Sequence, residues 1–186
     1  MRERLASLSM TLVVSVGRVR IGIVHGDAES LAGWRFAHDA LAQPAARPWL
    51  AGLRAASRID VFASSHTCLP ALRDFALDTG WLTVINNGAA GMPNFRGTTL
   101  GVITRIGVGA SRHRPLYGIQ REDVFIDALP VHYDQRRWLK DFLEDWPPGS
   151  PAYESYFQRL VDGPAFSIEE ALSGDAPSAL ACGCAR

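Results

Sequence analysis

The chain has few cysteines, no excess of charge of either sign and no long hydrophobic run. Its 186 residues include three cysteines, and 19 basic residues balance 19 acidic ones. A small, odd number of cysteines does not suit the dense disulfide framework of a secreted scaffold, so we expect a reducing, cytoplasmic compartment. Balanced charge gives no net field toward nucleic acid or an anionic membrane. We therefore expect no nucleic-acid partner.

No apolar stretch approaches the roughly 18 residues of a membrane span, so we expect no membrane association. The apolar run near the N-terminus resembles a signal peptide at first, but Arg18 and Arg20 interrupt it and no small-residue cleavage site follows. Apolar residues instead alternate on both sides of Gly17, which predicts a β-hairpin over residues 11–24.

Length and composition indicate one soluble globular domain. Hydrophobic residues make up 47% of the chain and charged residues 20%, values typical of a protein with its own core. We assign residues 1–174 to a single domain and residues 175–186 to a flexible tail. Cys182 and Cys184 lie in that tail, where a soft-metal or redox pair is an alternative to an unstructured end.

Residues with strand character dominate as far as Val131, and residues with helical character follow Tyr133. This order predicts an α/β fold in the layered α+β sense, with two helices inserted early. The predicted helices cover 30–41, about 48–56, 135–143, a segment that begins at Ser150 or Pro151, and a last turn that begins at Ser167. The predicted strands cover 59–63, a hairpin around 75–85, then 99–106 and 124–131.

Three predicted strands each end in a short polar segment. These segments are His25-Gly26-Asp27, Ser65-His66-Thr67-Cys68 and Asn86-Asn87-Gly88. Imidazoles at the carboxyl ends of strands can converge on one metal or phosphate. Each segment also has a structural interpretation: a buried histidine, an aspartate that caps a helix or orients the ring, and a tight turn instead of an anion-binding loop. Cys68 as a nucleophile is a further alternative, but no third residue is visible to orient its base.

In order along the chain, Val24–Asp27, Ala63–Pro70 and Ile85–Gly91 resemble the later motifs of the calcineurin-like metallophosphoesterases. In that family a strand ends in His-Gly, a later strand ends in Gly-His-Thr-His, and an Asn-Pro-Gly-Ser or Asn-Asn-Gly-Ser loop follows. The resemblance implies a β-sandwich flanked by helices and a phosphomonoester or phosphodiester substrate hydrolysed with divalent Mn, Fe, Zn or Ni. It implies that His25, His66 and Cys68 are metal ligands. Gly26, Asn86, Asn87 and Gly88 would line the phosphate side.

The sequence departs from the family in two ways. Cys68 replaces the second histidine of Gly-His-Thr-His, which shifts metal preference toward softer ions. The Asp-x-His and Gly-Asn-His motifs are missing, so we expect an incomplete sandwich that holds at most one ion well. An incomplete sandwich leaves a sheet edge uncovered, which favours a homo-oligomer. The alternative function is a non-catalytic binding or assembly module that kept the fold and lost the dimetal site.

Overall fold

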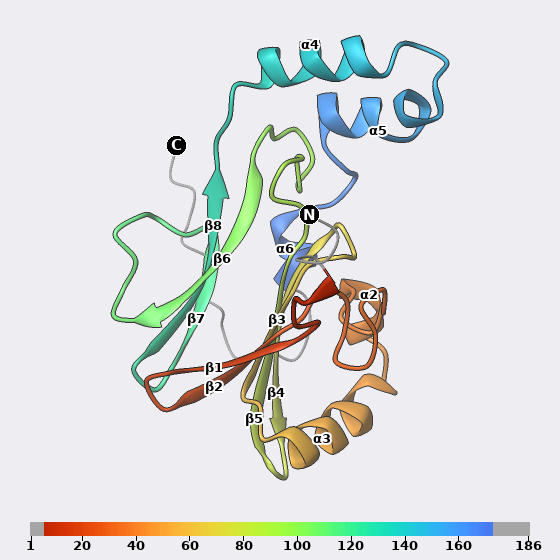
Figure 1. The fold of residues 1–186 in the computed structure, drawn as a ribbon. Helices are drawn as coiled ribbons and strands as arrows, with labels where there is room; N and C mark the ends of the chain where they lie inside the picture. Colours follow the sequence, from red (N-terminus) through yellow and green to blue (C-terminus); the bar gives the residue numbers. More distant parts are fainter. Residues whose placement is uncertain (1–5, 173–186) are drawn as a thin grey trace.

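The computed structural model describes residues 6–172, so the predicted tail with Cys182 and Cys184 lies outside the described residues. Two β-sheets face each other and helices flank them (Figure 1). The predicted layered α/β fold is thus confirmed. None of the helices among the described residues has the length and apolar character needed to cross a membrane.

The larger sheet has five strands in the order β1-β2-β3-β5-β4. β2, β3 and β5 run parallel to one another, and an antiparallel strand closes each side. The carboxyl ends of β2, β3 and β5 therefore lie at one edge, where α/β proteins place ligands. The strands are β1 (Leu12–Val16), β2 (Val19–Ile23), β3 (Val61–Ser64), β4 (Pro70–Leu77) and β5 (Gly80–Asn87).

The smaller sheet has three antiparallel strands in the order β6-β8-β7. β6 (Gly101–Val108) and β8 (Val124–Val131) lie where the sequence predicts strands. β7 (Tyr117–Arg121) was not predicted, because it follows a basic loop and has only five residues. It pairs with β8 across a two-residue turn, Glu122-Asp123, in which Glu122 has a positive φ of 53°.

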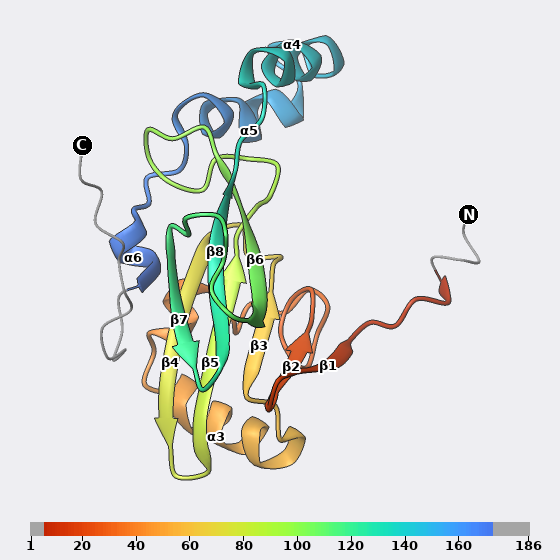
Figure 2. The same cartoon turned by 90° about the vertical axis from the view of Figure 1, so that its left-hand side faces the viewer.

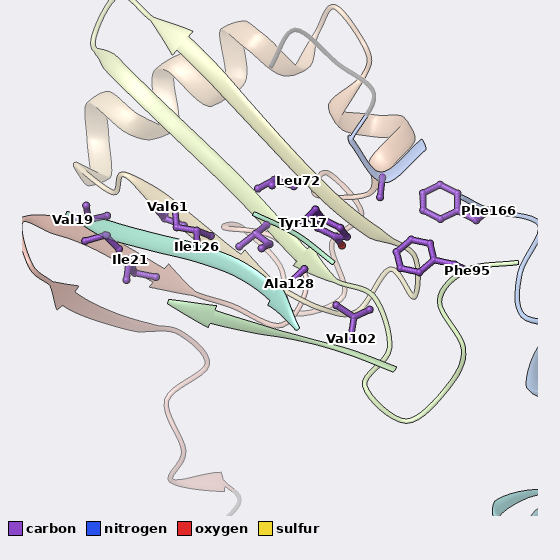
Figure 3. Packing of buried hydrophobic residues seen from close by; sticks show 13 residues of the cluster. Val19, Ile21, Val61, Leu72, Phe95, Val102, Tyr117, Ile126, Ala128 and Phe166 are labelled. Atoms are coloured by element: carbon purple, nitrogen blue, oxygen red, sulfur yellow. The ribbon is translucent and has the colours of Figure 1, made fainter. Parts of the chain in front are cut away.

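The core consists of two layers, one on each face of the larger sheet. The first lies between the sheets and includes Ile21, Ile85, Tyr117 and Ile126 (Figure 3). The second, which includes Leu50 of α3 (Ala46–Ser57), packs on the opposite face. Strands buried on both faces are nearly continuous in apolar residues, as in the Val61-Phe62 pair that divides between the two layers.

Three helices begin where capping residues predict. Asp134 accepts from the Arg137 N–H, and Ser150 accepts from the Tyr153 N–H. Ser167 and Glu170 form a reciprocal capping box, with bonds of 3.2 and 2.7 Å. The helices are α2 (His38–Leu41), α3 (Ala46–Ser57), α4 (Gln135–Asp145), α5 (Pro151–Asp162) and α6 (Ile168–Leu172).

The predicted helix over residues 30–41 is wrong except for its last turn. Residues 38–41 form α2, whereas residues 30–37 are turns and irregular chain. The Asp27 carboxylate is the cause, because it accepts from the backbone N–H groups of Glu29, Ser30 and Arg35. A side chain that takes these N–H groups competes with helical hydrogen bonding and bends the chain into a loop.

Candidate metal and phosphate site

The parallel strands bring the first two predicted segments together. The Val24 N–H donates to the Ala63 carbonyl and the Ser65 N–H donates to the His25 carbonyl, both at 3.0 Å. These bonds extend the pairing of β2 and β3 beyond the last residues of both strands. The backbones of His25 and Ser65 are thus fixed side by side at the carboxyl edge of the sheet.

The side chains of His25 and His66 meet at this edge. Nε2 of His25 lies 3.3 Å from Nδ1 of His66, and the ring centroids are 5.0 Å apart in an edge-to-face arrangement. His25 is exposed and His66 is half-buried, so solvent reaches the pair. Two imidazole nitrogens bound to one tetrahedral ion at about 2.0–2.1 Å lie about 3.4 Å apart. The observed separation is that of a hydrogen bond between the two rings, and it also matches the separation of two ligands of a single metal.

The loop that carries His66 and Cys68 is strained. Both residues have positive φ, 44° and 61°, which non-glycine residues rarely adopt. The Thr67 N–H donates to the Ser65 carbonyl and the Leu69 N–H donates to the Thr67 carbonyl, so each strained residue is the centre of a γ-turn. Such conformations cost about 1–3 kcal/mol each and persist only where surrounding contacts impose them.

Three contacts from distant parts of the chain impose this conformation. The Asn86 amide donates to Thr67 Oγ1 at 2.8 Å, and Ser65 Oγ donates to the Gly88 carbonyl at 3.3 Å. From α5, Arg159 Nη2 donates to the Cys68 carbonyl. Burial lowers the pKa of Arg159, and the Cys68 side chain opposes that shift. Arg159 lies 91 residues from Cys68 and could not be associated with the loop from the sequence.

The Cys68 thiol contacts the backbone of its own loop. Its Sγ donates to the His66 carbonyl at 3.3 Å. Within residues 6–172, no three His, Cys, Asp or Glu side chains are grouped so that they could hold a metal ion. The structure therefore assembles two of the three predicted ligands, and Cys68 as the third remains a prediction.

The predicted phosphate loop is a tight turn with internal hydrogen bonds. Gly88 has a φ of +66°, and a Cβ there would lie 2.3 Å from Asn94 Oδ1. Its N–H donates to Asn86 Oδ1, and the Ala89 N–H donates to Asn94 Oδ1. Asn86 is fully buried, and its amide also donates to the Phe36 carbonyl. Any contact of Asn86 or the Gly88 N–H with phosphate would require these bonds to change.

The other two predicted phosphate residues lie in different surroundings. Asn87 is half-buried, and its amide donates to the Val102 carbonyl at 3.1 Å. Gly26 packs against the loop that follows it, and a Cβ there would lie 2.6 Å from the carbonyl oxygens of Ser30 and Leu31. A close approach of backbone explains the glycine. Contact of Gly26 or Asn87 with phosphate stays a prediction.

Trp34 is a site residue that sequence reasoning missed. Its ring lies edge-to-face against His66 with centroids 5.4 Å apart, yet the residue is 59% exposed. The Asp27-bonded loop presents it there, and Gly33 allows the close approach because a Cβ would overlap the Asp27 carboxylate. No local pattern distinguishes this tryptophan from one on the apolar face of a helix.

Solved structures share this architecture. No protein-family model and no curated protein matches the chain. A hypothetical protein, PH1004 from Pyrococcus horikoshii OT3, is 18% identical over 89% of this chain with a TM-score of 0.55. A metallophosphoesterase from Sphaerobacter thermophilus is 17% identical over 87% of this chain with a TM-score of 0.51. The matches cover 55% and 62% of those two chains.

At these identities the likeness concerns the fold alone. The chain has two sheets flanked by helices, arranged as in proteins of the metallophosphoesterase fold. The predicted fold class is confirmed at this level, and the chain spans little more than half the length of these structural neighbours.

Proposed function

We propose that the chain carries a metal-dependent phosphoesterase site at the carboxyl edge of its parallel strands, centred on His25 and His66. The observation that carries the proposal is the 3.3 Å separation of Nε2 and Nδ1 from two segments 41 residues apart. The proposed substrate is a small phosphomonoester or phosphodiester. The metallophosphoesterase fold of a structural neighbour supports this choice of chemistry.

The residues present suit one borderline divalent ion. Two neutral imidazoles favour Zn, Fe, Mn or Ni, and a thiolate would favour the softer of these. The Cys68 thiol donates a weak S–H···O contact to the His66 carbonyl, so rotation about its χ1 could redirect it. A bound ion would polarise a phosphoryl oxygen and lower the pKa of a bound water. The chain's own part is to fix both imidazoles and to present Trp34 beside them.

Metal binding tests the proposal directly. Trp34 lies against His66, so Ni²⁺ or Co²⁺ bound at the pair should quench its fluorescence. We expect saturable quenching that His66→Ala abolishes and that Trp34→Phe reduces in amplitude without changing the apparent affinity. His113→Ala is the matched control, because His113 is an exposed loop histidine far from the pair in sequence.

Turnover tests the second half of the proposal. With Mn²⁺ and a generic aryl phosphate, we expect hydrolysis that His25→Ala and His66→Ala each reduce at least tenfold. Quenching that His113→Ala and His66→Ala affect equally would show adventitious binding and contradict the metal site. Metal binding without turnover would support the proposed metal site and contradict the proposed esterase activity.

The second candidate is a binding or assembly module without chemistry. It is favoured by the internal bonding of Asn86 and Gly88, which leaves the predicted phosphate loop fully engaged within the protein. Metal analysis of the purified chain after dialysis against micromolar Zn²⁺ or Mn²⁺ separates the two functions. A stoichiometry near one ion per chain supports the esterase site, and a metal-free protein supports the module.

A further inference from the structure

The helices α4 and α5 form a pair that lies outside the two sheets. Figure 2 shows both helices beyond the ends of β6 and β8. In the part of the chain that the structure describes, α4 has no buried residue and α5 has one, Leu160. The Gln135 amide donates to the Leu160 carbonyl at 3.0 Å, which joins the start of α4 to the end of α5. The last turn of α5, which carries Arg159 and Leu160, is thus the part of this pair that enters the body of the protein.

Arg159 has few partners for a cation that is partly withdrawn from water. The side chain is half-buried, and burial lowers its pKa. Among residues 6–172 it forms no ion pair with a carboxylate, and its Nε is buried without a hydrogen-bond partner. Its one hydrogen bond in that range runs from Nη2 to the Cys68 carbonyl. Because a cation without an anion is costly to bury, this arrangement contributes little to the stability of the fold.

The hydrogen bond from Arg159 acts on the second of the two strained residues in the candidate site. The other two contacts that hold this loop involve Thr67 and Ser65, which precede Cys68. Among the described residues, Arg159 is the only side chain that donates to the Cys68 carbonyl. A hydrogen bond from a charged donor is comparable in strength to the cost of one residue at an unfavourable positive φ. Without Arg159, the γ-turn centred on Cys68 would therefore be free to relax.

Relaxation at Cys68 would also affect His66. The two γ-turns share Thr67, whose N–H closes the first turn and whose carbonyl closes the second. In addition, the Cys68 thiol donates to the His66 carbonyl at 3.3 Å. A change in the backbone of Cys68 is thus transmitted to the residue whose imidazole lies against His25. Two imidazoles bind one ion well only when their nitrogens are held at the right separation, so small displacements matter here.

We propose that Arg159 is a positioning residue of the metal site, which holds the loop of His66 and Cys68 in place through the Cys68 carbonyl. This inference rests on the proposed metal site at His25 and His66. It makes the pair α4 and α5 part of that site, although Arg159 lies 91 residues from Cys68 in the sequence. Loss of the guanidinium group should therefore weaken metal binding while the stability of the protein changes little.

Ni²⁺ titration of the full chain, followed by the quenching of Trp34, tests this role. Arg159→Met keeps most of the side-chain volume and removes the donor, so we expect the apparent affinity to fall about tenfold, as for the loss of one hydrogen bond from a charged donor. Arg159→Lys should recover part of the affinity, because an ammonium group can donate to a single carbonyl. Arg137→Met on α4 is the matched control and should leave the affinity unchanged, because the Arg137 side chain is 81% exposed.

Amide hydrogen exchange of the metal-free protein gives a readout that does not depend on the metal. Peptides that cover residues 65–70 should exchange faster in Arg159→Met than in the wild type, while the urea midpoint stays close to that of the wild type. If the wild type shows no saturable quenching, the proposed metal site fails and the positioning role fails with it. If the wild type binds Ni²⁺, unchanged exchange or unchanged affinity in Arg159→Met overturns the positioning role alone. A fall in affinity that only parallels a fall in the urea midpoint overturns it as well.

Discussion

Tyr117 illustrates how a single residue can make the stability of this protein depend on pH. It is fully buried between the sheets, and its hydroxyl has no hydrogen-bond partner among the described residues. Burial raises its pKa, and the nearby Arg73 opposes that shift only partly. The neutral hydroxyl is therefore the only form that the core accommodates at ordinary pH.

The sign of the resulting pH dependence follows from the raised pKa. The unfolded chain loses the Tyr117 proton near pH 10, the usual value, while the folded protein keeps it. The stability that this residue contributes is complete below about pH 10 and is lost as the pH rises through the folded pKa. We expect the urea midpoint to fall above pH 10 and Tyr117→Phe to reduce that fall.

Tyr117→Phe also removes an unsatisfied buried hydroxyl. We expect no loss of stability at pH 7 and a gain of up to about 1 kcal/mol in the free energy of unfolding. Urea unfolding followed by circular dichroism measures both effects. A loss of more than about 1 kcal/mol at pH 7 would mean that the hydroxyl has a partner, such as a buried water, and that its burial is satisfied.

At the scale of elements, the loop after β2 depends on one carboxylate. Asp27 is buried and accepts three backbone N–H groups, at 2.9, 2.9 and 3.2 Å. Hydrogen bonds to a charged acceptor are worth more than neutral ones. We expect Asp27→Ala to lower the free energy of unfolding by about 2–4 kcal/mol, measured by urea unfolding.

A control variant and a measurement at the metal site show whether Asp27→Ala disturbs this loop or the protein as a whole. Asp39→Ala removes an exposed carboxylate that accepts from the Ala40 N–H, and should cost less than about 1 kcal/mol. Asp27→Ala should also weaken Ni²⁺ quenching of Trp34 under conditions where the protein remains folded, because the loop no longer holds that ring against His66. Unchanged quenching would show that the loop keeps its shape without the carboxylate.

The same loop shows what the sequence could and could not predict. The β1–β2 hairpin, the β4–β5 hairpin and the helix caps follow from patterns within a few residues, so they were predictable. The approach of His25 to His66 was predictable because parallel strands place their carboxyl ends at one edge. Loop residues 30–37 were not, because the N–H groups of this segment are taken by a carboxylate up to eight residues away.

The remainder of the site depends on contacts between distant segments. Arg159 reaches the Cys68 carbonyl across 91 residues, and Asn86 donates to Thr67 across 19. The hydrophobic periodicity of the sequence gives no information on hydrogen bonds between residues so far apart. The strained conformation of Cys68, whose thiol donates to the His66 carbonyl, depends on these contacts and could not be predicted from residue types alone.

At the scale of the whole molecule, a buried ion pair joins the two sheets. Asp74 on β4 is 7% exposed and accepts from Arg121 on β7, with the Arg121 Nε at 3.1 Å and a closer contact from Nη2. Thr83 of β5 donates to the same carboxylate at 2.6 Å. The Asp74 carboxylate therefore accepts hydrogen bonds from residues of both sheets, next to the core that lies between the sheets (Figure 3).

Removing one partner of such a pair should be costly. Arg121→Met keeps most of the side-chain volume but leaves a buried carboxylate with Thr83 as its remaining partner, so we expect a loss of about 3–5 kcal/mol in the free energy of unfolding. Arg35→Met breaks an exposed pair with Glu29, whose side chains are 55% and 58% exposed, and should cost less than about 1 kcal/mol. Urea unfolding at pH 7 compares them.

The double variant Arg121→Met/Asp74→Leu distinguishes two causes of a lower free energy of unfolding. One is the loss of the ion pair, and the other is the cost of a buried carboxylate without its cation. If the loss in Arg121→Met comes from stranding a buried carboxylate, adding Asp74→Leu should restore part of it, because apolar replacements of buried pairs are often neutral. Losses that simply add would mean that water reaches Asp74 once Arg121 is shortened. The two sheets would then be held by their apolar contacts, and the ion pair would contribute to their alignment more than to their stability.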